Sequence, residues 1–233
     1  MRFNRYNLIE AVKNNDINKI NSILKSEKAD INSKDKYCET ALMIASYKGN
    51  LEIVKLLVDN GADVNIKNDI GNTALMFASE YGQLDIVKYL VENGADINIK
   101  DDDGESALIH ALEDSTKKEK SLEIVQYLID NGADINTTNN YYGKTALMIS
   151  SSEGHLEMVK LLVENGADVK AKDKDKDGWT ALMRASWRGY SEIVKYLVKN
   201  GADINIKNND GKTALDLADS EEIKEVLRKT GAK

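Results

Sequence analysis

The stretch TALMFASEYGQLDIVKYLVENGADIN, residues 73–98, contains the whole pattern that decides the fold. Thr73 at its head is suited to cap a helix, because its hydroxyl can accept a hydrogen bond from an amide of the first turn. Farther on, Asp85, Lys88 and Glu92 recur at helical spacing, which predicts the polar face of a second, amphipathic helix. Gly94 then ends that helix, since glycine readily adopts the left-handed conformation found after helices. The stretch therefore predicts a pair of short helices joined by a turn.

Two markers from this stretch recur in phase along the chain. The triplet Thr/Ser-Ala-Leu starts at Thr40, Thr73, Ser106, Thr145, Thr180 and Thr213, with steps of 33, 33, 39, 35 and 33 residues. The tetrad Asn-Gly-Ala-Asp starts at Asn60, Asn93, Asn131, Asn165 and Asn200. Between each tetrad and the next triplet lies a short polar segment, which is too hydrophilic for a core and is predicted to project as a finger. The chain is therefore predicted to be a repeat protein.

These repeats resemble ankyrin repeats in their period and in the position of the Thr-Ala-Leu signature. The resemblance implies an all-α ankyrin-repeat solenoid of about seven helix-turn-helix units with projecting β-hairpin-like fingers. It also implies a single domain over residues 1–233. Within it, residues 1–33 form an N-terminal capping repeat, residues 34–206 five internal repeats, and residues 207–233 a C-terminal capping repeat.

The repeats depart from the family pattern in composition and in length. The family's usual Pro is Ala in all six triplets, and its usual His is mostly Met or Ile, which predicts an apolar seam between neighbouring repeats. The third repeat carries five extra residues within 113–121, and the fingers before Thr145 and Thr180 are longer than the others by one and two residues. Insertions in repeat proteins map to loops on one face, which is often the binding face.

Composition narrows the class of partner and the cellular setting. The formal net charge of −7 disfavours nucleic acid and membrane surfaces, since both attract cationic proteins. The single cysteine, Cys38, has no partner for an internal disulfide, and no segment is apolar enough to predict a membrane span. We therefore expect a cytoplasmic, monomeric protein whose partner is another protein.

The residues that could support chemistry do not form a recognisable motif. The run Asp173 to Gly178 begins like a calcium loop, but its twelfth position is Arg184 where a bidentate Glu would be needed. His110 and His155 have no cysteine or second histidine at zinc-ligand spacing. Cys38 has no base nearby that could activate it as a nucleophile. The sequence therefore predicts no catalysis, no metal and no cofactor.

Aromatic and charged residues at particular repeat positions predict a binding surface. The resemblance implies that one face of each first helix, together with the finger tips, lines the concave side of the stack. Aromatic residues and arginine are enriched in binding hot spots. The residues predicted to contact a partner are Tyr47, Tyr81, Asp102, Asp103, Tyr141, Tyr142, Trp179, Arg184, Trp187 and Arg188.

The charges on this surface predict a polarised groove. Around the third repeat we expect a run of acids that favours a basic segment of the partner: Asp101, Asp102, Asp103, Glu105, Glu113 and Asp114. Around the fifth repeat, Arg184 and Arg188 beside Trp187 favour an apolar or acidic segment. Two alternatives stay open. Trp179, Trp187 and Arg188 could instead bind a nucleotide-like small molecule, or the chain could be a structural module of a larger assembly.

Overall fold

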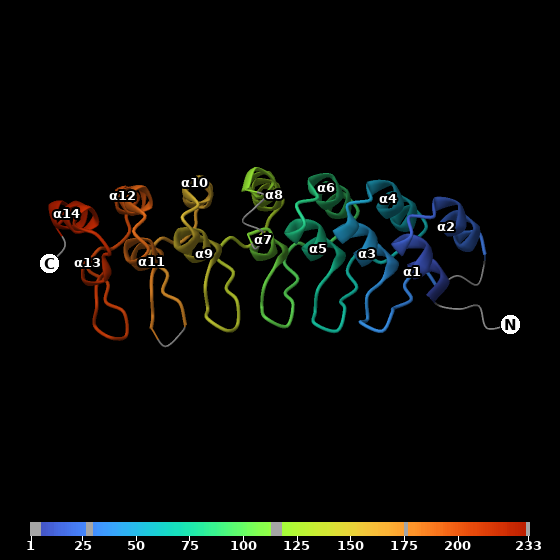
Figure 1. Cartoon of the computed structure of the whole chain (residues 1–233), viewed down its shortest axis with the longest axis horizontal. Helices are drawn as coiled ribbons and strands as arrows, with labels where there is room; N and C mark the ends of the chain where they lie inside the picture. Colours follow the sequence, from blue (N-terminus) through green and yellow to red (C-terminus); the bar gives the residue numbers. More distant parts are fainter. Residues whose placement is uncertain (1–5, 27–29, 113–117, 175–176, 232–233) are drawn as a thin grey trace. The chain divides into compact units, whose positions relative to one another are not determined.

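The computed structural model describes residues 6–26, 30–112, 118–174 and 177–231. The chain divides into two compact units, Met1–Ala133 and Asp134–Lys233, and each unit is built from helix pairs joined by long loops (Figure 1). The described residues form no sheet, and their β-structure is limited to isolated bridges at the bases of four fingers. The predicted all-α ankyrin-repeat fold is therefore confirmed, whereas the prediction of one domain with capping repeats at residues 1–33 and 207–233 stays a prediction.

The first unit contains four helix pairs in its described residues. The pairs are α1 (Tyr6–Lys13) with α2 (Ile17–Leu24), α3 (Ala41–Lys48) with α4 (Leu51–Asp59), α5 (Ala74–Glu80) with α6 (Leu84–Glu92), and α7 (Ala107–His110) with α8 (Lys118–Asp130). In the last pair, the extra residues predicted within 113–121 lengthen α8 by four residues at its start. Residues 113–117, which include Glu113 and Asp114, lie outside the described residues.

The second unit contains three helix pairs in its described residues, so the predicted number of about seven is confirmed. They are α9 (Ala146–Glu153) with α10 (Leu156–Glu164), α11 (Ala181–Trp187) with α12 (Ser191–Lys199), and α13 (Ala214–Leu217) with α14 (Glu221–Lys229). The first helix of the last pair, α13, has only four residues. None of the described helices of either unit has the length and apolarity needed to cross a membrane.

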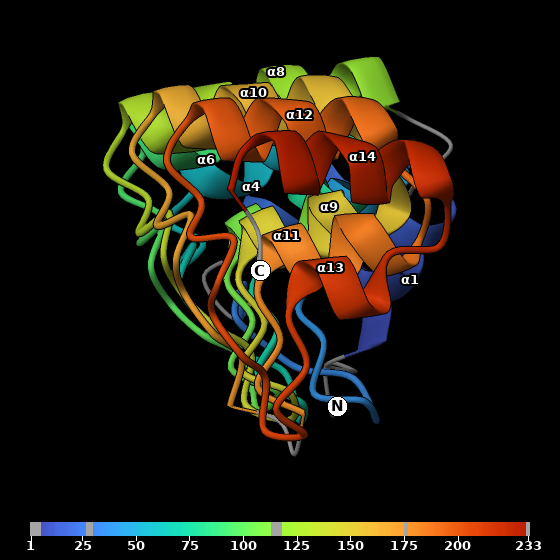
Figure 2. The same cartoon turned by 90° about the vertical axis from the view of Figure 1, so that its left-hand side faces the viewer.

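Within each unit the elements form three layers. The second helices of the pairs lie side by side, the first helices form a parallel row beneath them, and the fingers project beyond the first helices (Figure 2). The core lies between the two helix layers, where Leu42, Leu75 and Leu108 of the first helices are at most 2% exposed. Ile53, Ile86 and Val87 of the second helices are buried against them.

The Thr of the triplet caps the first helix as predicted, with one exception. Thr40, Thr73, Thr145, Thr180 and Thr213 each accept a hydrogen bond from the backbone amide three residues later. Ser106 makes no such side-chain bond. The methionines that replace the family's histidine are buried, and the Met43 and Met76 sulfurs accept bonds from the Thr40 and Thr73 amides at 3.4 and 3.3 Å.

Two kinds of turn require positive φ. Gly94 follows α6 with a φ of 89°, as predicted for the end of the second helix. At the finger tips Gly71 has a φ of 84°, and a Cβ there would lie 2.7 Å from the Asp102 amide nitrogen of the next finger. Cys38 occupies the same tip position in the first finger with a φ of 57°. A side chain in this conformation costs roughly 1–2 kcal/mol.

Candidate functional site

The surface of interest in each unit consists of the exposed sides of the first helices and the fingers, and we call it the finger face. The fingers span residues 34–40, 67–73, 100–106, 138–145, 172–180 and 207–213. Backbone hydrogen bonds join the second finger to the third in the first unit, and each finger to the next in the second unit. The Asp102 amide donates to the Ile70 carbonyl at 3.1 Å, and the Lys174 amide donates to the Tyr142 carbonyl at 3.2 Å. The first and second fingers are joined instead by the Lys34 side chain, which donates to the Lys67 carbonyl at 2.7 Å. Hydrogen bonds therefore hold neighbouring fingers of each unit together.

The second residue of each finger is an Asp or Asn that organises its turn. These residues are Asp35, Asn68, Asp101, Asn139, Asp173 and Asn208. The Asn68 side-chain oxygen accepts the amides of Ile70 and Asn72 at 3.1 and 2.8 Å. The Asp173 Oδ1 accepts the Trp179 amide at 2.9 Å. Such side-chain bonds replace the backbone pairs that a loop lacks, so this Asp or Asn fixes the shape of the finger.

Where this residue is Asp, its second oxygen is paired with the side chain of a basic residue. Asp35 Oδ2 lies 3.3 Å from Lys13 Nζ, Asp101 Oδ2 lies 2.9 Å from His110 Nε2, and Asp173 is bonded to Arg184. Where it is Asn, the helix position that His110 and Arg184 occupy is apolar: Phe77, Ile149 and Leu217. The third and fifth fingers therefore combine Asp with a basic residue at that helix position, and the fingers with Asn combine it with an apolar residue. The first finger differs, because its helix has Ile44 at that position and Asp35 pairs with Lys13 of α1. We call the three combinations of Asp with a basic residue the Asp–cation pairs.

The Asp101–His110 pair shifts the acidity of its carboxyl group. Burial raises the pKa of Asp101, but hydrogen bonds from the His110 ring and from the Glu105 amide outweigh burial and hold the pKa below its ordinary value of 3.8. The folded chain therefore stabilises the ionised carboxylate. Because the His110 side chain is only 6% exposed, this pair belongs to the interior of the third repeat rather than to its surface.

Asp101, Glu105 and His110 also form the one described group with ligand atoms close enough to hold a metal ion, all within 4.8 Å of one another. Glu80 lies on the other side of the ring, 3.9 Å from His110 Nδ1. One imidazole and two carboxylates are acceptable ligands for a divalent transition metal. However, the second unit places Arg184 where His110 stands, and a guanidinium does not bind metals. We therefore interpret the group as one of the three Asp–cation pairs.

The fifth repeat brings four of the predicted partner-binding residues together into what we call the Trp–Arg patch: Trp179, Arg184, Trp187 and Arg188. The two indoles meet edge to face with ring centroids 5.7 Å apart. The Arg184 guanidinium lies 5.8 Å from the Trp179 ring, and the Arg188 guanidinium stacks 4.8 Å from the Trp187 ring. Trp187 is 50% exposed and Trp179 is half-buried. The patch is a preformed, partly apolar surface with a cationic rim.

The first unit carries a second aromatic group, which we call the Tyr–Phe patch: Tyr47, Phe77 and Tyr81. Tyr47 lies between the other two rings, with centroids 6.1 Å from Phe77 and 5.8 Å from Tyr81. Tyr81 is 39% exposed. Asp102 and Asp103 are exposed on the finger of the third repeat, as predicted.

Tyr141 and Tyr142 occupy the tip of the fourth finger, where they are 76% and 48% exposed. Their rings lie 6.3 Å apart, and the Lys144 ammonium stands 4.5 Å from the Tyr142 ring.

The run predicted to resemble a calcium loop does not offer Asp173 as a free ligand, because Arg184 and the Trp179 amide already bind its carboxylate. Asp175 and Lys176 of that run lie outside the described residues.

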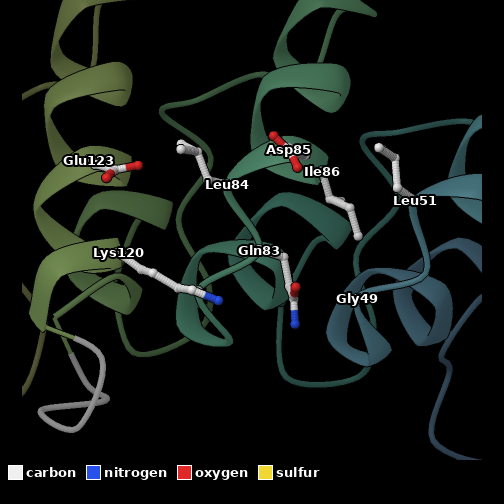
Figure 3. A pocket seen from close by; sticks show the side chains of 9 residues that line it. Gly49, Leu51, Gln83, Leu84, Asp85, Ile86, Lys120 and Glu123 are labelled. Atoms are coloured by element: carbon white, nitrogen blue, oxygen red, sulfur yellow. The ribbon is translucent and has the colours of Figure 1, made fainter.

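A separate pocket of about 280 Å³ lies in the first unit at the starts of α4, α6 and α8 (Figure 3). Figure 3 shows Gln83 reaching toward Gly49, with Lys120 and Glu123 of α8 on the other side. Gly49 has a φ of 75°, which favours glycine, and a Cβ there would lie 2.7 Å from the end of the flexible Gln83 side chain, which would have to shift. The pocket is small for a ligand site and contains none of the predicted partner-binding residues.

The ring and ion-pair contacts within each patch are the part of the site that sequence reasoning missed. Equivalent repeat positions predicted which residues share a face, but not that Tyr47 contacts Phe77 or that Arg184 is held by Asp173. A signal for the second contact was available in the chain itself. In the third and fifth repeats, Asp near the start of the finger occurs with a basic residue at the fourth helix position, whereas every finger with Asn there has an apolar residue at that position.

Profiles of known families match most of the chain. Two ankyrin-repeat profiles cover residues 8–101, 98–173 and 173–218, the first described as three copies of the repeat and the second as many copies. The chain therefore belongs to the ankyrin-repeat family. Ankyrin-repeat domains are in general modules for protein–protein interaction and are typically not enzymes. A comparison with curated protein sequences found no significant match.

Solved ankyrin-repeat structures are similar over nearly the whole chain. The ankyrin repeat domain of Bcl-3, described as a unique member of the IkappaB protein family, is 28% identical with a TM-score of 0.84, over 95% of this chain and 97% of that chain. The human ASB11 ankyrin repeat domain is 24% identical with a TM-score of 0.77, over 97% of this chain and 98% of that chain. At 24% identity, the similarity to the ASB11 domain shows a shared fold only.

Proposed function

We propose that this protein is a non-enzymatic, cytoplasmic adaptor that binds a protein partner on its finger face. The Trp–Arg patch is the observation that carries the proposal. A half-exposed indole held against a second indole offers apolar area in a fixed orientation, so binding a partner there costs little conformational entropy. Trp and Arg are also the residue types that contribute most to binding when they are buried at an interface.

The opposite layer of the molecule offers no comparable surface in the described residues. The exposed stripe of the second helices is charged, and several of its residues are paired within the chain. Tyr89 donates to Asp59 at 2.7 Å across neighbouring helices, and Lys160 donates to Glu157 at 2.8 Å. Charged stripes of this kind keep a protein soluble and contribute little binding energy. The finger face is therefore the surface on which we expect partners.

Affinity capture with matched variants tests the proposal. Immobilised wild-type protein, Trp187→Ala and the outer-face control Lys160→Ala are each exposed to lysate of the source cells, and bound proteins are quantified by mass spectrometry. We expect a protein that wild type and Lys160→Ala retain and that Trp187→Ala loses, because removing a central aromatic anchor costs about 2 kcal/mol of binding energy. Proteins retained equally by Trp187→Ala and lost from Lys160→Ala would contradict the proposal. Circular dichroism of each variant shows that the fold is intact.

A further inference from the structure

The charges of the two finger faces have opposite sign. In the first unit the three fingers carry seven carboxylates against four lysines. In the described residues of the second unit's fingers there are five lysines against three aspartates, and one of these, Asp173, is neutralised by Arg184. Even with Glu153 of the neighbouring helix α9 and Asp219, whose carboxylate lies beside Gly189, included, cations outnumber unpaired carboxylates around the Trp–Arg patch. A chain with a net charge of −7 therefore presents a locally cationic surface there.

The two arginines of the patch have different roles. Arg184 lies deep, with its side chain 14% exposed, and its charge is used to balance the buried carboxylate of Asp173. Arg188 is exposed and, within the described residues, makes no ion pair, while the Trp187 ring supports its guanidinium from one side. A stacked guanidinium keeps its donors available at its edge, where a carboxylate can be bound by two parallel hydrogen bonds.

We propose that the Trp–Arg patch binds an acidic segment of the protein partner, in which a carboxylate side chain neighbours an apolar one. The carboxylate pairs with Arg188, and the apolar side chain packs on the exposed half of Trp187. The lysines of the surrounding fingers attract such a segment and repel a basic one, since complementary charge selects partners and speeds association. This inference rests on the proposed function and adds the chemistry of the segment that the second unit recognises.

Selection from a random peptide library displayed on phage tests the inference without knowledge of the partner. Phage are selected on the immobilised full chain, and retained clones are screened for loss of binding to Trp187→Ala. We expect clones that depend on Trp187 to be enriched in Asp and Glu beside an apolar residue. The chain contains two tryptophans, both in the patch, so titration of a selected synthetic peptide can be followed by tryptophan emission.

The peptide's affinity is then compared among variants. We expect Arg188→Gln to weaken binding about tenfold, Arg188→Lys to weaken it less, and the outer-face control Lys160→Gln to leave it unchanged. Raising the salt concentration should weaken binding to wild type more than to Arg188→Gln. Selected peptides that are basic or neutral, or that bind Arg188→Gln as tightly as wild type, overturn the inference while leaving the proposed function intact. If no clone depends on Trp187, the inference is overturned and the proposed function loses the patch that carries it.

Discussion

The Asp–cation pair of the fifth repeat can be tested by exchanging it for the combination that other repeats use. The Asp173 side chain is fully buried, so Arg184→Ile leaves a buried carboxylate without its cation. Breaking such a pair costs about 3 kcal/mol. Asp173→Asn keeps the acceptor for the Trp179 amide and leaves Arg184 able to turn toward solvent, so we expect a loss of about 1.5 kcal/mol, the lower range for a hydrogen bond to a charged group.

The double variant, Asp173→Asn with Arg184→Ile, recreates the Asn139 and Ile149 combination of the preceding repeat. Well-packed apolar replacements of buried ion pairs are often tolerated, so we expect a net loss of about 1.5 kcal/mol for the double variant and a coupling energy of about 3 kcal/mol. Urea unfolding measures each free energy, with tryptophan emission reporting on the second unit and circular dichroism on all helices. If the free energy of unfolding lost in the double variant equals the sum of the losses in the two single variants, Asp173 and Arg184 are not coupled and the proposed pairing is refuted.

Three further predictions concern the turns and the acid limit of stability. Gly94→Val should lower the free energy of unfolding by about 1 kcal/mol or more, because nothing crowds the site and the cost comes from positive φ alone; an unchanged urea midpoint would exclude this. Cys38→Gly should raise the melting temperature by relieving a left-handed non-glycine residue, worth about 1 kcal/mol, and calorimetry that shows a decrease would contradict it. Folding lowers the pKa of Asp101, so this carboxylate stabilises the folded chain at pH values above its ordinary pKa of 3.8. That stabilisation is lost as the pH falls through the lower pKa of the folded state. Asp101→Asn should therefore make the free energy of unfolding fall less steeply with pH on the acidic side of the stability–pH curve. A fall as steep as that of wild type would argue against this.

Most of the fold could be predicted from the sequence because each element has a local signal. The Thr of the triplet and the Gly of the tetrad act within one helical turn, so their positions predicted the helix starts and ends directly. Ser106 shows the limit of this reasoning. It occupies the Thr position and has a hydroxyl, but makes no capping bond, and its helix α7 ends after four residues. The sequence predicted an insertion there without indicating that the first helix would be short and α8 long.

The candidate site was predicted as a set of residues on one face but not as a set of contacts. Repeat positions predicted that Arg184, Trp187 and Arg188 share a face with Trp179 nearby. They could not show that Arg184 is committed to Asp173 while Arg188 is not, because that difference depends on burial and on the direction of each side chain. The same reason applies to His110, whose interior position follows from the finger that covers it.

Site-specific photo-crosslinking tests the central claim, that the finger face binds the partner, most directly. A photoreactive phenylalanine analogue replaces Tyr81 or Trp187 on the finger faces, and Glu92 or Glu157 on the exposed outer helices, in four otherwise identical proteins expressed in the source cells. The account predicts that irradiation gives a discrete adduct with another protein from position 187 or 81 and none from positions 92 and 157. Adducts that form only from positions 92 and 157 would contradict it.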